Sequence, residues 1–309
     1  MNQTILRSST WIQGVRERAR VHPWTVAALG VGGIAVILLL VQSLSEILFG
    51  GEHVAVGYAL KGGLAAFGAT AAGAVPVVFL KRMPQRVSDS MLGFAAGMML
   101  AASSFSLIIP GIAAAGRLVG EGLFAVLTVV FGMGLGVALM LGLDEFTPHE
   151  HETVGQCGPG VERLGRVWLF VFAIVLHNLP EGMAIGVGFS RGDMAVGVPL
   201  TTAIAVQDIP EGLAVALAMR SAGFSLQTSM WSGIGSGIVE PLGAILGVGL
   251  SSGLAVAYPV GLGLAAGAML FVVSHEVIPE THRNGHQTPA TLGLMGGFAL
   301  MMVLDTVLG

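Results

Sequence analysis

Two copies of one short pattern, a polar pair followed by an apolar residue and Pro-Glu-Gly, lie within strongly apolar sequence. The copies read His177-Asn178-Leu179-Pro180-Glu181-Gly182 and Gln207-Asp208-Ile209-Pro210-Glu211-Gly212. Ionisable groups at membrane depth are costly, so they usually mark a substrate path or a relay. Imidazole and carboxylate groups are also ligands for divalent metal ions. The first hypothesis is therefore a divalent metal ion crossing a lipid bilayer.

The spacing within each copy brings its polar groups onto one side of a helix. His177 and Glu181 are four residues apart, and Asp208 and Glu211 are three apart, so each pair shares a helical face. At about 1.5 Å of rise per residue, both pairs lie roughly 12–21 Å from the ends of their apolar segments. Glu240, halfway along the next segment, falls at a comparable depth. We predict that these groups form one polar layer near the membrane midplane.

The charge of this layer requires compensation. Four carboxylates in a medium of low dielectric constant repel one another, so they must be protonated or hold cations. One or two divalent ions are the simplest solution, and the imidazole favours zinc and its neighbours over magnesium or calcium. The alternative is a proton-sharing network that holds helices together.

Three prolines each adjoin a buried carboxylate. Pro180, Pro210 and Pro241 each remove a backbone donor, which frees the carbonyl four residues earlier, at Leu176, Val206 and Gly237 respectively. In lipid such a carbonyl needs another partner, for example a metal or its water. The glycine after each Pro-Glu is predicted to leave room for a pathway.

The elements that position these groups are long apolar segments. The chain has 309 residues, of which 10% are charged, and a mean hydropathy of +0.82. A soluble domain carries about 25% charged residues, so this sequence indicates an all-α integral membrane protein. Each apolar segment reaches the ~20 residues that a spanning helix needs. Nine segments are predicted: 24–49, 54–80, 88–110, 119–143, 167–190, 194–220, 225–250, 255–280 and 288–308.

Basic residues predict the orientation. With nine spans, 11 of the 14 Lys and Arg residues fall in the N-terminal tail (1–23) and the even-numbered connections. Such an excess indicates the cytoplasmic side. We therefore expect a multi-pass protein of the cell membrane with a cytoplasmic N-terminus, a cytoplasmic histidine-containing loop (144–166) and a C-terminus outside. Its surroundings are lipid, and no nucleic-acid partner is expected.

The motif His-Asn-Leu-Pro-Glu-Gly, with a second Pro-Glu-Gly helix and a preceding histidine-bearing loop, resembles the ZIP family of metal transporters. The resemblance, to a prokaryotic member, covers residues 54–309 as eight spans, so 24–49 is an extra N-terminal transmembrane helix. It implies a three-two-three bundle whose outer triplets are related by an inverted repeat, a shape that suits alternating access around a midplane site. It also implies homodimers that import zinc into the cytoplasm, with cadmium, iron and manganese as possible alternative ions.

The resemblance further implies a two-metal centre. The residues that match the family's ligands are His177, Asn178, Glu181, Asp208, Glu211 and Glu240. Gln207 stands where many members carry a histidine, which leaves the zinc preference of the second metal position open.

Several residues outside this centre are candidates for the pathway. The resemblance places Met99 and Ser106 beside the metal centre, although core packing explains both as well. Asp89 and Asp305 lie near opposite membrane faces, as gates or as solvated helix ends. Gln207 is also assigned to the pathway.

On the cytoplasmic side, alternating histidine and acidic residues suggest an exit. Asp144, His149 and His151 form a loose metal-collecting tract, for which plain solvated charge is the alternative. His275 and Glu276, still within their span, are the stronger candidates for exit ligands, together with His286.

Two rival functions use similar residues. An intramembrane zinc protease would need His-Glu-x-x-His, and the partner of His177 four positions on is Glu181, so no enzyme is expected. A proton-coupled carrier of an organic cation would use the carboxylates without needing His177 or Asn178. A purely structural membrane protein would tolerate loss of paired carboxylates.

Overall fold

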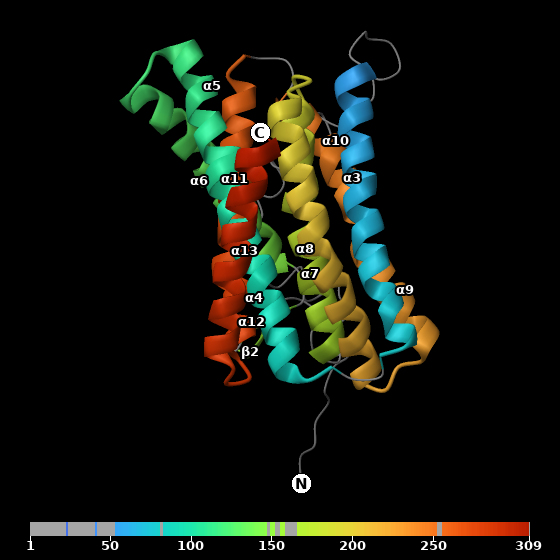
Figure 1. The fold of residues 1–309 in the computed structure, drawn as a ribbon. Coiled ribbons are helices and arrows are strands. Elements are labelled where there is room, and N and C mark those ends of the chain that lie inside the picture. The colour runs from blue at the N-terminus through green and yellow to red at the C-terminus, as the bar shows by residue number, and fades with distance from the viewer. Residues whose placement is uncertain are drawn as a thin grey trace.

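The computed structural model describes residues 53–80, 83–146, 149–151, 155–157, 166–251 and 255–308, together with Pro23 and Val41. The described chain forms an upright bundle of helices (Figure 1). Eight of its helical stretches are long and apolar enough to cross a membrane. Apart from those two single residues, the predicted tail and the extra helix 24–49 lie outside the described residues.

The spans follow the predicted order. Their elements are α3 (His53–Ala74) with the 3-10 turn η1 (Val75–Val78); α4 (Gln85–Ala102), the π-helical turn η2 (Ser103–Ile108) and α5 (Ile109–Val119); α6 (Leu123–Phe146); α7 (Arg166–Phe189); α8 (Met194–Ser221); α9 (Leu226–Ser236) and α10 (Val239–Ser251); α11 (Ala257–Val272), the π-helical turn η4 (Val273–Val277) and α12 (Ile278–His282); and α13 (Gln287–Leu308). The predicted all-α membrane fold is confirmed.

One predicted boundary is wrong. The third predicted span was expected to end at residue 110 and the next to begin at 119, yet one helical rod runs from Gln85 to Val119. Pro110 does not end it, because the π-helical turn before the proline absorbs the missing hydrogen bond and α5 starts with Pro110 in its first turn. The turn to α6 instead contains Gly120 and Gly122, both with positive φ.

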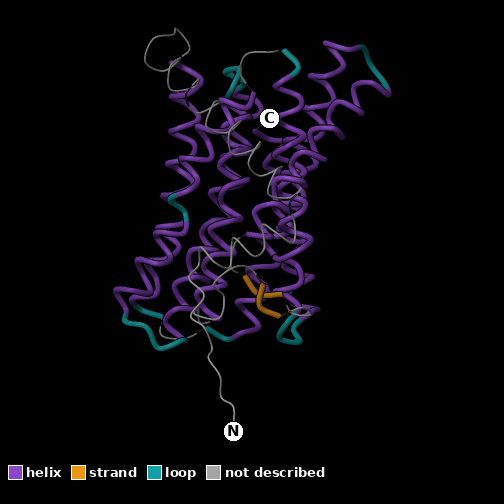
Figure 2. The backbone as a smooth tube through the Cα atoms, turned by 180° about the vertical axis from the view of Figure 1, so that it is seen from behind, coloured by secondary structure: helices purple, strands orange, loops and turns teal. Residues whose placement is uncertain are grey.

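The predicted loop 144–166 is also more ordered than expected at its start. α6 continues to Phe146, so Asp144 belongs to the last turn of a helix. Beyond it, β1 (His149–His151) pairs antiparallel with β2 (Gly155–Cys157), and His149 lies opposite Cys157. Figure 2 shows this small hairpin at one end of the bundle, among loops that join the helix ends.

The helices pack as two groups. α3, α7, α8, α9 and α10 pack mainly on one another, while α4 packs along α13 and α11 along α6. Close approach within the second group depends on glycines, because an added Cβ would overlap the facing backbone. Gly93 and Gly97 of α4 abut Ala290 and Leu294 of α13, and Gly263 and Gly267 of α11 abut Val129 and Met133 of α6.

These contacts reveal the predicted inverted repeat residue by residue. The α11 glycines follow the α4 glycines by 170 positions, and each set meets the backbone of the next outer helix. The converse contacts match as well, with a shift of 161 positions between the glycines: Gly293 and Gly297 of α13 abut Ser90 and Phe94, whereas Gly132 and Gly136 of α6 abut Val260 and Leu264. The first triplet (α3, α4–α5 and α6) and the second (α9–α10, α11–α12 and α13) are therefore joined to each other by two equivalent sets of close approaches.

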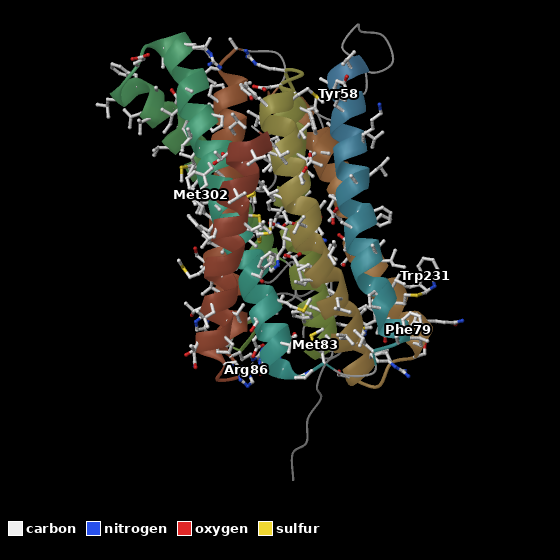
Figure 3. All side chains as sticks on the ribbon, in the orientation of Figure 1. Tyr58, Phe79, Met83, Arg86, Trp231 and Met302 are labelled. Carbon is white, nitrogen blue, oxygen red and sulfur yellow. The ribbon has the colours of Figure 1, made fainter. Side chains whose placement is uncertain are left out.

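The periphery of the bundle is apolar. Only 11% of the α13 span is buried inside the molecule, against 71% of the α7 span, so α13 is an outer helix and α7 a central one. Phe79, Trp231 and Met302 project outward (Figure 3) and are largely exposed. Large exposed apolar side chains around the bundle are what a lipid-facing surface requires.

Candidate metal centre

The centre lies on three neighbouring elements. Pro180 and Pro210 sit inside α7 and α8, which continue through them. The span 226–251 is instead interrupted: α9 ends at Ser236, and Glu240 lies in the first turn of α10. The helix N-terminus at this break carries a partial positive charge, which favours a carboxylate there.

The break corrects the expectation for Pro241. The carbonyl of Gly237 was predicted to be freed by this proline, yet it accepts a hydrogen bond from the Glu240 backbone N–H at 3.0 Å. The carbonyl that the break offers to the centre is that of Ser236, which accepts a hydrogen bond from Asn178 Nδ2 at 3.0 Å. Sequence reasoning missed Ser236; the only signal was the dense run of glycines around it.

Three carboxylates meet at the centre. One oxygen from each of Glu181, Asp208 and Glu211 lies within 4.8 Å of the others. All three side chains are at most 1% exposed. The predicted convergence of α7 and α8 at one depth is confirmed, and three like charges at this range need a cation or protons.

Further polar groups surround these carboxylates. His177, Asn178, Gln207 and Glu240 are also buried. Gln207 donates a hydrogen bond from its Nε2 to Glu181, one of the three carboxylates. Gln207, assigned beforehand to the pathway, is therefore part of the centre itself.

Most of these side chains keep one polar atom without a hydrogen bond. Within the described part of the chain, the buried atoms of this kind at the centre are His177 Nδ1 and Nε2, Asn178 Oδ1, Glu181 Oε2, Gln207 Oε1, Asp208 Oδ1 and Oδ2, Glu211 Oε2 and Glu240 Oε2. Buried polar atoms are normally paired, because an unpaired one costs about 1–3 kcal/mol. Such a concentration of unsatisfied lone pairs is the arrangement that a metal ion satisfies.

Neighbouring groups orient the free atoms. Asn178 uses its nitrogen on Ser236, so its oxygen remains available. Gln207 Nε2 donates to Glu181 Oε1, which leaves an oxygen on each side chain. The hydroxyl of Thr70, on α3, donates to Glu240 Oε1 at 2.7 Å. Thr70 was also missed, since a single threonine in an apolar segment carries little signal.

The prediction that the motif glycines leave room for a pathway is wrong. A Cβ on Gly182 would overlap the backbone carbonyl of Glu240, and one on Gly212 would overlap that of Thr70. The space beside each Pro-Glu-Gly is filled by the backbone of an adjacent helix. The glycines therefore bring α10 against α7 and α3 against α8.

The predicted pathway residues lie on both sides of the centre. Met99 is fully buried, and the buried Ser106 donates a hydrogen bond to Asp305 Oδ1 at 2.6 Å. This pair joins η2 to α13. Towards the opposite end, His177 Nε2 lies 3.4 Å from Glu276 Oε2 of η4, and the His275 ring stacks on Phe271 at 4.8 Å. Asp144, His149 and His151 are described in their backbone only, so their predicted role stays a prediction.

Asp89 is a buried anchor and not a solvated helix end. Its Oδ1 accepts hydrogen bonds from Gln85 at 2.9 Å and from Asn284 at 3.1 Å. Its Oδ2 lies 2.8 Å from His286 Nδ1. Asp89, a predicted pathway residue, and His286, a predicted exit residue, are thus paired with each other across α4 and the turn before α13.

Replacing Asp89 by alanine should destabilise this end of the bundle. Losing these charge-assisted hydrogen bonds is expected to lower the melting temperature by roughly 4–8 °C. The measurement is thermal unfolding of the purified protein in detergent. Glu280→Ala, which removes a partly exposed partner of Arg283 nearby, serves as the control and should change little. Equal melting temperatures for Asp89→Ala and wild type would contradict the anchor.

A bundle of membrane-length helices around a buried carboxylate and imidazole centre defines a polytopic ion transporter. A family model for ZIP zinc transporters matches residues 145–305. The chain belongs to the ZIP family, which is a family of transporters and not of enzymes.

Relatives support this assignment along most of the chain. The zinc transporter ZIPB of Bordetella bronchiseptica is 60% identical over 292 residues, which cover 94% of each chain. The zinc transporter GufA of Myxococcus xanthus is 40% identical over 254 residues, covering 82% of this chain and all of GufA. The human zinc transporter ZIP11 is 32% identical, covering 83% of this chain and 99% of its own.

Proposed function

We propose that this protein carries Zn²⁺ across the cell membrane into the cytoplasm, through two adjacent metal positions at the centre. The observation that carries the proposal is the set of buried nitrogen and oxygen atoms without hydrogen-bond partners on α7, α8 and α10. The names of the relatives, all zinc transporters, support zinc as the ion. Cadmium, iron and manganese remain candidates as further substrates.

The helix phases support two positions. Successive residues of an α-helix point about 100° apart, so His177 and Asn178 face different sides of α7, as do Gln207 and Asp208 on α8. His177 and Gln207 would serve one position, and Asn178 and Asp208 the other. Glu181 and Glu211, one turn further along the two helices, would be shared between them. The first position then has the imidazole that favours zinc.

Charge supports the proposed orientation of the protein in the membrane. By the predicted topology, 11 of the 14 Lys and Arg residues, among them Arg86, Arg220 and Arg283, fall on the side where α4 begins and α8 ends, which is the lower end in Figure 1. Under the positive-inside rule, this end faces the cytoplasm and the C-terminus lies outside. The contact between His177 and Glu276 leads from the centre towards the same end. By family resemblance, the working unit would be a homodimer.

Replacing His177 separates metal transport from its main rival. In proteoliposomes with an internal zinc-sensitive dye, His177→Ala should reduce the initial zinc flux by about 10-fold or more, because a ligand nitrogen is lost. The combined His177→Ala and Glu211→Ala protein should show no flux. His282→Ala is the matched control, because among the described residues the hydrogen bonds of His282 stay within its own turn, to Ile278 and Thr281.

An organic-cation carrier predicts a different pattern. It needs the carboxylates but not the imidazole, so His177→Ala would transport normally while Glu211→Ala would not. A wild-type protein without flux for any of a panel of divalent metals would overturn the proposal.

A further inference from the structure

Thr70 makes the only contact with the centre that comes from α3 among the hydrogen bonds of the described residues. Its side chain is fully buried, and its hydroxyl lies 2.7 Å from Glu240 Oε1 and 3.3 Å from the carbonyl of Ala66. A hydroxyl carries one proton, so the shorter contact is the hydrogen bond that it donates. The second oxygen of Glu240, Oε2, is left buried and without a hydrogen bond.

The inverted repeat makes Thr70 and Glu240 equivalent residues. They are 170 positions apart, the same shift that relates the glycines of α4 and α11. Their surroundings match: Gly212 abuts the backbone of Thr70, and Gly182 abuts the backbone of Glu240. The next turn repeats the match, since Gly73 abuts the carbonyl of Ile209 and Gly243 abuts that of Leu179. The hydrogen bond therefore joins the two copies of one position, across the pseudo-twofold axis of the centre.

This arrangement makes the two halves of the centre chemically unequal. One repeat supplies the carboxylate of Glu240, and the other supplies the neutral hydroxyl of Thr70, which donates a hydrogen bond to one of the two carboxylate oxygens. A carboxylate with both oxygens free can bind an ion through both of them, which suits ions that take six or more oxygen ligands. A carboxylate with one free oxygen contributes a single ligand, which suits the four-coordinate geometry of zinc.

We propose that Thr70 is a positioning residue that restricts Glu240 to one ligand oxygen and thereby favours zinc over manganese. The inference rests on the proposed function, because it assigns a role at the same centre. It predicts that removing the hydroxyl, without changing the shape of the side chain, weakens zinc binding and shifts the ion preference.

The test is Thr70→Val, with Thr70→Ser as the conservative variant. Thr202→Val is the matched control, because the Thr202 hydroxyl, as far as the described residues go, bonds only the carbonyl of Val198 in its own helix. Zinc and manganese affinities are measured on the purified protein by competition with a chelating dye, and both fluxes are measured in proteoliposomes. Size-exclusion profiles report whether each variant is folded, and Thr70→Ala replaces Thr70→Val if the valine is not accommodated.

Thr70→Val should lose about 10-fold in zinc affinity, the lower bound for loss of a group that orients a metal ligand. Manganese affinity should fall less or rise, so the zinc-to-manganese ratio of both affinity and flux declines. Thr70→Ser should restore the ratio, and Thr202→Val should keep it. A general packing defect would lower the affinities and fluxes of zinc and manganese by the same factor. The zinc-to-manganese ratio would then not change in Thr70→Val, and Thr70→Ser would have no ratio to restore.

The two proposals fail differently. Suppose that wild type transports zinc, and that Thr70→Val keeps the wild-type zinc-to-manganese ratio or lowers the affinity and flux of both ions by the same factor. The role of Thr70 is then overturned, and the proposed function stands. If wild type neither binds nor transports zinc or manganese, the proposed function fails, and the role of Thr70 falls with it.

Discussion

Zinc flux is expected to fall by on the order of 100-fold or more when Glu181 is replaced by glutamine. Glu181 lies where α7 and α8 meet, within the group of three carboxylates. Its Oε1 accepts from Gln207, and its Oε2 is free. Glutamine keeps the size of the side chain but removes the charge that both metal positions would share. The initial rate of dye response in proteoliposomes measures the effect.

The matched control for Glu181→Gln is Glu121→Gln, at the turn between α5 and α6. The same chemical change there is remote from the centre and should leave flux within the error of the assay. Both proteins should elute as single species in detergent, so that loss of flux is not loss of fold. Zinc flux at the wild-type rate through Glu181→Gln would rule out the shared-ligand arrangement.

Replacing Gly212 by alanine is expected to abolish most of the folded protein. The added methyl group would overlap the backbone of Thr70, which cannot move without separating α3 from α8. Overpacking typically costs about 1–3 kcal/mol when side chains can shift, and a facing backbone shifts less readily. The yield of monodisperse protein by size-exclusion chromatography should fall several-fold, and the melting temperature with it.

Gly68→Ala is the control on the same helix pair. A Cβ at Gly68 of α3 meets nothing within 4 Å, and alanine is a better helix former by about 1 kcal/mol. That variant should be as stable as wild type or more so. By the repeat, Gly182→Ala should behave like Gly212→Ala, because it meets Glu240 in the same way. A stable, active Gly212→Ala protein would show that the helices are further apart than described.

The spans and the convergence of the two motifs could be predicted from the sequence. Apolar length fixes a membrane helix almost by itself, and the spacing of Glu181, Asp208 and Glu211 fixes their faces and depths. Gln207 could be located by the same reasoning, but its hydrogen bond to Glu181 could not. That bond depends on the rotation of two helices about their axes, which hydrophobic patterning in lipid leaves open.

Interruptions of the helices could not be predicted. Pro110 and Pro279 suggest breaks, yet each follows a π-helical turn inside a continuous rod. Pro241 suggests a kink, yet the helix is interrupted four residues earlier, at Gly237. Whether a helix bends, widens or stops is decided by which neighbour accepts the unpaired backbone groups, and such neighbours come from distant sequence. The hydrogen-bond partners of Thr70 and Asp89 could not be predicted for the same reason.

The 170-residue shift between equivalent positions has a further consequence for topology. From α3 to the interrupted helix α9–α10 the chain crosses the bundle five times, an odd number, so equivalent helices run in opposite senses. Parity alone thus turns the second triplet over with respect to the first. Adding or removing one membrane crossing ahead of α3 would reverse the orientation of both triplets in the membrane together. The contacts between the triplets would stay the same. Adding one between α6 and α9 would turn only the second, and the glycine contacts that hold the halves together could not form.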